Sequence, residues 1–492
     1  MPQSQSSRRS QNVQYEKVDV SYFENRKLRR HADWLLLWAL GVGAVIAGDY
    51  FGWNFGLPAG GFGGLLIATV VVAVMYVCMV YCIAELSTAL PHAGGFYSFT
   101  RSAFGPWAGY VVGVTDTIEY VITPAVVVVG IGGYIHKLFP DVSIYLWWLI
   151  SYAIFVGINI KGVELTLKVG LWVTIIAIAV LVIFFVGVIA QGAFNSDLLF
   201  NINATNGGTK FLPFGWYGVF AALPFAIWFY LAIEQVPLAA EETVDVVKDM
   251  PKALITGIFT LLVLSVFTLV LIPGVNGGSA VIGVSEAPLA EGFQAIYGVG
   301  ATSAALTIIA MVGLIASFHT IIYAYGRVLF ALSRAGYFPR WLSVTGKNSH
   351  TPHRALILGA VVGFLCAVLI DQFGEGIVGA ALLNMAVFGA VISYTAVMAA
   401  YIKLKRDKPQ MTRPYKSPLG NAGAYVGVVL SLLSLAATFA VPDYRPGVYG
   451  VAVFMIIALI YFAFYSSRRL VAQAPEEEVA LILDAEKELA HR

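Results

Sequence analysis

Long apolar stretches alternate with short polar loops along almost the whole chain. A helix that crosses a bilayer needs about 20 mostly apolar residues and must satisfy all its backbone hydrogen bonds internally. The pattern therefore predicts an all-α polytopic membrane protein with about twelve transmembrane helices. We place them at about residues 34–57, 63–90, 105–137, 143–160, 166–190, 214–240, 251–273, 295–332, 355–371, 378–402, 423–441 and 446–465. The third and the eighth are longer than a bilayer requires, so we expect them to tilt or to project.

The first stretch is irregular. Between residues 41 and 52 it holds four glycines, and Asp49 lies among them. Each glycine inside a helix costs roughly 0.5–1 kcal/mol relative to alanine, and an aspartate in mid-membrane costs ~2.5–3.5 kcal/mol on insertion scales. A close helix crossing would explain the glycines but not the carboxylate. The pattern favours a helix that is unwound here and lines a polar cavity.

The sixth stretch is the second irregular one, because Pro224 and Pro237 flank the acid Glu234. A proline inside a helix removes a backbone donor and kinks or breaks the helix. Interruptions at corresponding positions of two halves are typical of an inverted-repeat transporter with a midplane site. We therefore predict a five-plus-five inverted repeat with interrupted helices 1 and 6, plus two additional helices. The predicted parts are a cytoplasmic tail at 1–32, a transport core at 33–402 (repeats at about 33–190 and 214–402), a cytoplasmic loop at 403–422, two further helices at 423–465 and a cytoplasmic tail at 466–492.

Composition and charge agree with one membrane domain. Only 12% of the residues are charged, about half of what soluble domains carry, and the mean hydropathy is +0.79. With both termini in the cytoplasm, only Lys137, Lys210 and Arg445 of the 30 basic residues fall outside, which predicts that orientation. We expect the membrane to be a bacterial inner membrane. The net charge of +2 gives no reason to expect nucleic acid. We expect the two charged tails to be solvated.

Catalytic and metal-binding patterns are missing from the sequence. The three cysteines, Cys78, Cys82 and Cys366, lie in apolar stretches without the spacing of a zinc site, and we interpret them as packing residues. We find no nucleophile elbow, phosphate loop or paired metal-ligand histidines, so neither an enzyme nor a cofactor is expected. A receptor or scaffold would not need two interrupted spans.

Several loops resemble those of the amino acid–polyamine–organocation permeases. The matching runs are AELSTALPHAGGFY at 84–97, AAEET at 239–243 and GRVLFALSRAGYFP at 326–339. Within this superfamily, GDYFGWNFGL at 48–57 and IEYVITPA at 118–125 look most like the ethanolamine permeases. The resemblance implies a secondary transporter whose partners are the bilayer and a small-molecule amine, and it leaves open whether the chain forms a homo-oligomer.

The resemblance also implies a substrate site in the first and sixth helices. In amino-acid carriers of this superfamily, small residues around the positions of Ala47 and Gly48 offer free amides to the substrate carboxylate. Asp49 stands where glycine is usual, and its carboxylate would repel a carboxylate and attract an ammonium. The alternative is that Asp49 caps the outer half-helix. Trp228 matches the aromatic that covers substrate, and Phe225 and Tyr230 flank it.

Further candidates come from the other spans. Asp116 and Glu119 are three residues apart and share a helical face, which favours a cation site, although Asp116 could be solvated and Glu119 could be structural. Glu234 and His319 are candidates for coupling or gating, as is Asp116; each could equally be structural, and His319 a packing residue. Ser317 could line the cavity. The lysine that some proton-coupled relatives carry in the fifth span is missing near Ala177.

Together these features predict import of a small cationic amine, with ethanolamine as the favoured substrate. The alternative is an amino-acid or polyamine permease of the same fold. A polyamine carrier needs acids for two ammonium groups, and a carrier of zwitterions needs a carboxylate site. Asp49 therefore discriminates between these substrates, because its carboxylate would attract an ammonium and repel a carboxylate.

Overall fold

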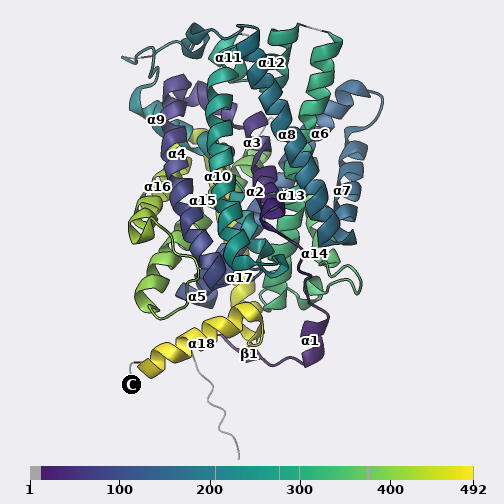
Figure 1. Ribbon diagram of the computed structural model, residues 1–492, viewed down its shortest axis with the longest axis vertical. Coiled ribbons are helices and arrows are strands. Elements are labelled where there is room, and N and C mark those ends of the chain that lie inside the picture. Colours follow the sequence, from purple (N-terminus) through teal and green to yellow (C-terminus); the bar gives the residue numbers. More distant parts are fainter. Residues whose placement is uncertain (1–12, 206, 276, 299, 374–376, 491–492) are drawn as a thin grey trace, which may run out of the picture.

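The computed structural model of the protein describes residues 13–205, 207–275, 277–298, 300–373 and 377–490. Most of its helices run roughly along one common direction and form a single bundle (Figure 1). Within the described ranges, eleven helices are long and apolar enough to cross a membrane, and the shorter apolar helix Trp34–Tyr50 precedes them. The predicted all-α polytopic membrane fold is confirmed.

The membrane-spanning segments follow the predicted order. In sequence they are α2 (Trp34–Val45) with α3 (Ala47–Tyr50) and η1 (Trp53–Phe55), α4 (Gly56–Ala89), α6 (Pro106–Leu138), α7 (Ile144–Lys161), α8 (Val163–Ala190), α9 (Gly215–Ala226) with η3 (Ile227–Phe229) and η4 (Ile233–Glu242), α10 (Val246–Leu271), α13 (Ala301–Arg334), α14 (His353–Phe373), α15 (Ile377–Asp407), α16 (Gly420–Ala440) and α17 (Arg445–Phe464). The most deeply buried of them are α6, the α9–η4 segment and α15, whereas α7, α14 and α17 lie at the periphery.

Short elements occupy the connections. They are α1 (Val20–Glu24), α5 (Phe96–Phe104), η2 (Ser196–Phe200), α11 (Gly278–Ile282), α12 (Pro288–Tyr297), η5 (Arg340–Ser343), η6 (Pro442–Tyr444), η7 (Ser466–Arg468), α18 (Pro475–Ala490) and the strands β1 (Tyr15–Glu16) and β2 (Leu470–Val471). The predicted stretch 295–332 is therefore not one helix, because its first residues belong to α12 and α13 begins only at Ala301.

A sharp bend at Gly61 separates the first span from the second. Gly61 has φ +70° and ψ 172° inside α4, and a side chain there would collide with the ring of Pro213. Glycine is the residue that adopts a positive φ without steric cost. The residues from Trp53 to the bend at Gly61 therefore form the second half of the first span, and the second span begins near Phe62.

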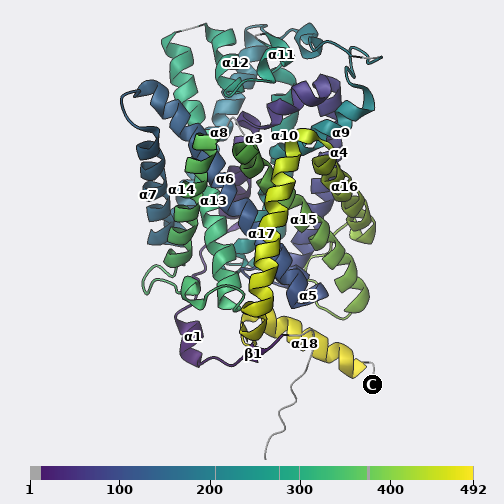
Figure 2. The same ribbon diagram turned by 180° about the vertical axis from the view of Figure 1, so that it is seen from behind.

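The expectation of solvated charged tails is wrong for the start of the carboxyl-terminal tail. In the amino-terminal tail Lys17, Arg29 and Arg30 are exposed as expected, and residues 1–12 lie outside the described residues. Strand β1 pairs in parallel with β2, and α18 lies beneath the same end of the bundle (Figures 1 and 2). Glu476 and Glu477 at the start of α18 are fully buried. The Arg334 guanidinium lies 2.5 Å from Glu476, and the Nε atom of Arg101 donates to Glu477 at 2.8 Å. Burial of these carboxylates is stabilised by arginines that the body of the bundle presents.

Candidate functional site

The first span is interrupted next to Asp49. After α3 the backbone becomes extended at Phe51, and Gly52 has φ +99° before η1 begins at Trp53. Asn54 fixes this conformation, because its side-chain oxygen accepts from the Gly52 amide at 3.1 Å. Its Nδ2 group donates to the carbonyls of Ile282 and Ser285, both at 2.9 Å. The connection that contains α11 thus holds η1, the start of the second half of the first span, in place.

The sixth span is interrupted over residues 227–232. Helix α9 ends two residues after Pro224, η3 follows, and Ala232 then takes a left-handed conformation with φ +82°. A non-glycine residue held there costs of order 1–3 kcal/mol and persists only when its surroundings enforce it. Glu234 does so by accepting from the Ala232 amide at 3.1 Å. The predicted interruptions of the first and the sixth span are both present.

The two interruptions lie against each other. Any side chain on Gly48 would collide with the backbone carbonyl of Trp228. The Trp228 ring covers Gly52, where an added Cβ atom would lie 2.9 Å from the ring carbon Cδ2. Gln235 ties the sixth span to α2 by donating to the Leu40 carbonyl at 2.7 Å. Glycine is needed at position 48 because the two backbones approach too closely for a side chain, and at position 52 because the Trp228 ring occupies the space and φ is positive.

Asp49 is buried at this contact without an ionic partner. It is fully buried, and within the described part of the chain neither of its carboxylate oxygens has a hydrogen-bond partner. Thr268 of α10 and Tyr230 are its polar neighbours. The N-cap of η1 is Gly52, which provides no side-chain cap, so Asp49 does not cap the outer half-helix. A carboxylate removed from water costs several kcal/mol unless a cation or hydrogen bonds compensate for it.

A second group of buried acids lies where α6, η4 and α15 meet. Glu119 is a direct neighbour of Glu234, and the carboxylate of Glu119 has no other partner among the described residues. Tyr394 donates to Glu234 at 2.5 Å. Ser393 donates to Asp116 at 2.6 Å, and Asp116 is 2% exposed, so the alternative that it is solvated is wrong.

Comparison with known proteins identifies the family of this chain. The family model described as amino acid permease matches residues 35–477, which is nearly the whole chain. The chain belongs to the amino acid permease family. An uncharacterised transporter of Rhizobium meliloti is 28% identical to this permease over 87% of the permease and 90% of its own length. The branched-chain amino acid permease of Bacillus subtilis is 26% identical, with coverage of 80% and 84%. The L-asparagine permease of Salmonella typhimurium is 26% identical, with coverage of 88% and 87%.

Membership in this family makes the chain a transporter of small molecules and not an enzyme. The contact between the first span, at α3 and η1, and the sixth span, at η3, is then the candidate transport site of this permease. The structure brings Ala47, Gly48, Asp49, Trp228 and Tyr230 together there.

Ser317 lies at the inner edge of the site. Its hydroxyl contacts the carbonyls of Gly43 and Ala44 in the last turn of α2 and accepts from the Ala47 amide at 3.3 Å. Tyr50 donates to the carbonyl of Ala177 at 2.7 Å, at the place where some relatives were expected to carry a lysine. Both contacts connect the interrupted first span to its neighbours α13 and α8.

Two predicted residues lie elsewhere in the permease. The Phe225 ring packs on Tyr444, with centroids 5.1 Å apart, and does not join Trp228 and Tyr230. His319 is fully buried and its Nε2 atom lies 2.8 Å from the carbonyl of Thr166 on α8. This placement is that of a packing histidine, away from Asp49.

Sequence reasoning missed several residues that connect the two groups of acids. Tyr76 of α4 has its hydroxyl 3.0 Å from that of Tyr394, and its ring lies 5.3 Å from the Tyr230 ring. The Tyr230 hydroxyl lies 2.8 Å from that of Ser265 on α10. Ser265 and Thr268 are three residues apart in an apolar span, and this helical spacing was the signal that could have identified them.

Proposed function

We propose that this permease imports a small primary amine that lacks a carboxylate, with ethanolamine as the substrate, across the bacterial cytoplasmic membrane by alternating access. The observation that carries the proposal is the buried Asp49 carboxylate, which has no ionic partner among the described residues and lies at the contact between the first and the sixth span. An ammonium group would supply the compensating charge. An additional carboxylate at this place would be repelled.

The backbone amides of the interruption support this choice of substrate. A zwitterion carrier needs free amides here to hold the carboxylate of its substrate. In this permease the Ala47 amide donates to Ser317, the Asp49 amide to the Ile46 carbonyl and the Gly52 amide to Asn54. These donors are already occupied, so a carboxylate would gain little from them.

Aromatic and acidic side chains would complete the site. The Trp228 ring lies over Gly52, and a cation beside an aromatic face gains about 0.5–2 kcal/mol. We assign Tyr230, a polar neighbour of Asp49, to the same site. We propose that Glu119 and Glu234 form a second acidic position for the substrate. The contact between the rings of Tyr230 and Tyr76 connects the Asp49 site to this second position.

The orientation and the driving force follow from charge. We infer that residues 33–402 form the inverted-repeat core and that both termini are cytoplasmic, because nearly all basic residues then lie inside. A substrate with one positive charge gains about 2.3 kcal/mol per 100 mV of inside-negative potential. This corresponds to roughly 50-fold accumulation, since about 1.4 kcal/mol is tenfold. With Ala177 in place of a lysine, we expect uptake without a sodium gradient and with only a modest contribution from protons.

A second candidate is transport of a neutral amino acid, favoured by the names of the relatives from Bacillus subtilis and Salmonella typhimurium. Uptake of radiolabelled ethanolamine into proteoliposomes, under a potassium–valinomycin potential with equal pH and sodium on both sides, distinguishes the two. We expect accumulation that excess ethanolamine prevents and that alanine, asparagine and leucine do not. Accumulation of a labelled amino acid and none of ethanolamine would refute the proposal.

The Asp49→Asn variant tests the residue itself. It keeps the shape of the side chain and removes the charge, so we expect at least a tenfold loss of ethanolamine uptake. Asp141→Asn is the matched control, because Asp141 is exposed in a connection outside the helices. Equal uptake by the two variants would contradict the assigned role of Asp49.

A further inference from the structure

A cavity of about 470 Å³ lies between the end of α4, the end of α15 and the connection from α15 to α16. It is separate from the candidate transport site, and α18 and β1 lie at the same end of the bundle as the ends of α4 and α15 that line it (Figure 1). Its lining consists of Glu85, Lys405, Pro409, Met411, Arg413 and Lys416. Three cationic side chains thus surround one carboxylate, which leaves an excess of two positive charges.

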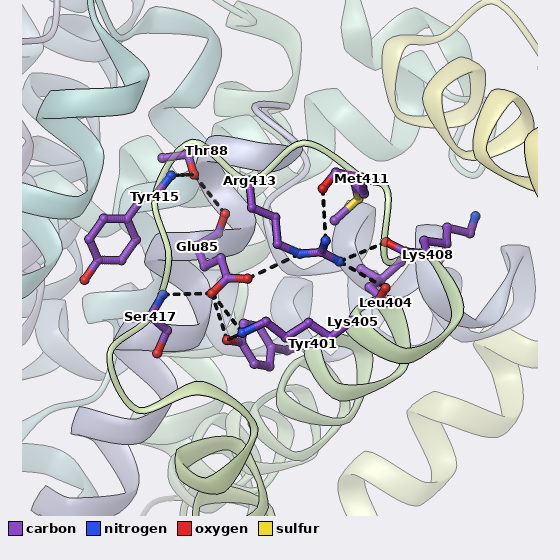
Figure 3. Close-up of polar contacts among 10 residues, drawn as sticks. All are labelled: Glu85, Thr88, Tyr401, Leu404, Lys405, Lys408, Met411, Arg413, Tyr415 and Ser417. Carbon is purple, nitrogen blue, oxygen red and sulfur yellow. Dashed lines mark hydrogen bonds and ion pairs between the residues drawn. The ribbon is translucent and has the colours of Figure 1, made fainter.

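The buried carboxylate organises the cavity. Glu85 is fully buried and accepts from the Tyr401 hydroxyl and the Ser417 amide, both at 2.8 Å (Figure 3). Lys405 approaches the same oxygen to 3.4 Å, and Arg413 approaches the other oxygen to 3.3 Å. Glu85 therefore holds the loop against α4, and its single charge cannot neutralise both cations.

Arg413 is fixed with part of its donor capacity unused. Its guanidinium donates to the carbonyls of Met411 at 2.9 Å, Leu404 at 3.0 Å and Lys408 at 3.2 Å, as Figure 3 shows. A guanidinium has five N–H donors, so one remains after these three bonds and the contact with Glu85. A cation held in this way is preorganised and loses little freedom when an anion binds.

Lys416 contributes a positive charge with no internal role. It is exposed on the rim of the cavity, and its side chain has no hydrogen bond or ion pair with any residue that the structure describes. Lys405 bonds to the Tyr401 hydroxyl at 2.5 Å and keeps a further ammonium proton. The free donors of all three cations therefore surround one space.

We propose that this cavity binds the phosphate group of an acidic phospholipid headgroup in the leaflet next to the termini. Phosphate oxygens match the guanidinium and ammonium donors, and basic pockets between spanning helices at this depth are suited to such headgroups. The chain that leaves the cavity continues as α16, which lies on the outside of the bundle in both views (Figures 1 and 2).

Apolar surface beside the cavity favours a lipid over a soluble phosphate compound. Leu419, directly before α16, and Tyr425, Val426 and Val429 on its first turns are 38–63% exposed. In a spanning helix these side chains face acyl chains. A phospholipid could place its phosphate among the three cations and its acyl chains along α16, whereas a soluble phosphate would use only the first contact.

The test compares lipids and free phosphate on the purified full-length permease in neutral detergent. Short-chain phosphatidylglycerol, phosphatidylcholine, glycerol 3-phosphate or inorganic phosphate is added at equal concentration, and both the melting temperature and the lipid bound in native mass spectra are recorded. We expect phosphatidylglycerol alone to bind and to raise the melting temperature. An equal effect of phosphatidylcholine would overturn the charge argument, and an equal effect of either soluble phosphate would overturn the assignment to a lipid.

Lys416→Gln tests the site, because Lys416 stabilises nothing else in the described structure. We expect it to lose at least half of the response to phosphatidylglycerol. The matched control is Lys347→Gln, an exposed lysine in the connection between α13 and α14, which should respond like the wild type. If Lys416→Gln proves unstable, Lys416→Arg keeps the charge and must keep the response. An equal response of the two glutamine variants would refute the proposal.

Discussion

Replacing Glu477 by glutamine should detach the carboxyl-terminal tail from the bundle. Glu477 is fully buried, and its carboxylate accepts from Arg101 Nε at 2.8 Å, from the Tyr337 hydroxyl at 2.7 Å and from the Tyr15 hydroxyl at 3.0 Å. A glutamine has the same shape but no charge, and its amide nitrogen would replace one of the accepting oxygens by a donor.

The expected loss is about 3–5 kcal/mol, because removing one partner of a buried ion pair leaves the other charge uncompensated. The arginine cannot lose its proton to relieve this cost, since its pKa is far above neutral. Either Tyr15 or Tyr337 would in addition face an amide group that cannot accept its proton, which costs about 1–3 kcal/mol when the donor stays buried. We expect the strand pair β1–β2 to open with the tail.

The neighbouring residue is a matched control. Glu478 is exposed one position further along α18, and an exposed substitution of this kind changes stability by only about 0.5 kcal/mol. Denaturant unfolding of the purified permease in detergent gives the difference in free energy, and limited proteolysis reports whether the tail has become accessible. If Glu477→Gln and Glu478→Gln agree within about 0.5 kcal/mol and resist protease equally, the buried pair does not hold the tail.

Three further predictions concern the transport site and pH. Glu119→Gln should abolish ethanolamine uptake in proteoliposomes with little change in melting temperature, whereas a purely structural Glu119 would give the opposite result. Gly48→Ala should destabilise the permease by at least about 1–3 kcal/mol, because the added methyl group collides with the Trp228 carbonyl, and uptake should fall with it; a fully active Gly48→Ala variant would place the two backbones further apart. Burial lowers the pKa of His92 from 6.5 to about 4, so the unfolded chain takes up this proton first and stability is lost as the pH falls from 6.5 through 4, by roughly 3 kcal/mol. The loss of unfolding free energy between pH 7 and pH 4 should therefore be smaller in His92→Gln than in the wild type, by roughly 3 kcal/mol. An equal loss in both proteins would show that His92 is not the group responsible.

The spans and their interruptions could be predicted because they depend on local sequence. A run of apolar residues reveals a membrane helix by its length alone, and Pro224 or Asp49 disturbs a helix wherever it folds. The same reasoning could not determine side-chain directions. Phe225 and Trp228 are three residues apart, yet the end of α9 directs Phe225 towards Tyr444 and Trp228 towards Gly52.

Long-range pairing was the part that local patterns could not reveal. The run of glutamates at 476–478 has the composition of a solvated helix end, and nothing near it indicates burial. The partner of Glu477 is Arg101, 376 positions earlier in the chain. Tyr76 and Tyr394 are likewise separated by 318 positions, and each lies in an apolar stretch where a tyrosine is unremarkable in sequence.

The pairing of the two tails also sets an order of events during synthesis. Arg101 is synthesised 376 residues before its partner Glu477, and Arg334 is synthesised 142 residues before Glu476. At about 5–20 residues per second, the interval between Arg101 and its carboxylate is tens of seconds. Until then β1 has no partner strand and one buried arginine has no counter-ion. A nascent chain that has not yet reached Glu477 therefore lacks the carboxylate that compensates the buried charge of Arg101.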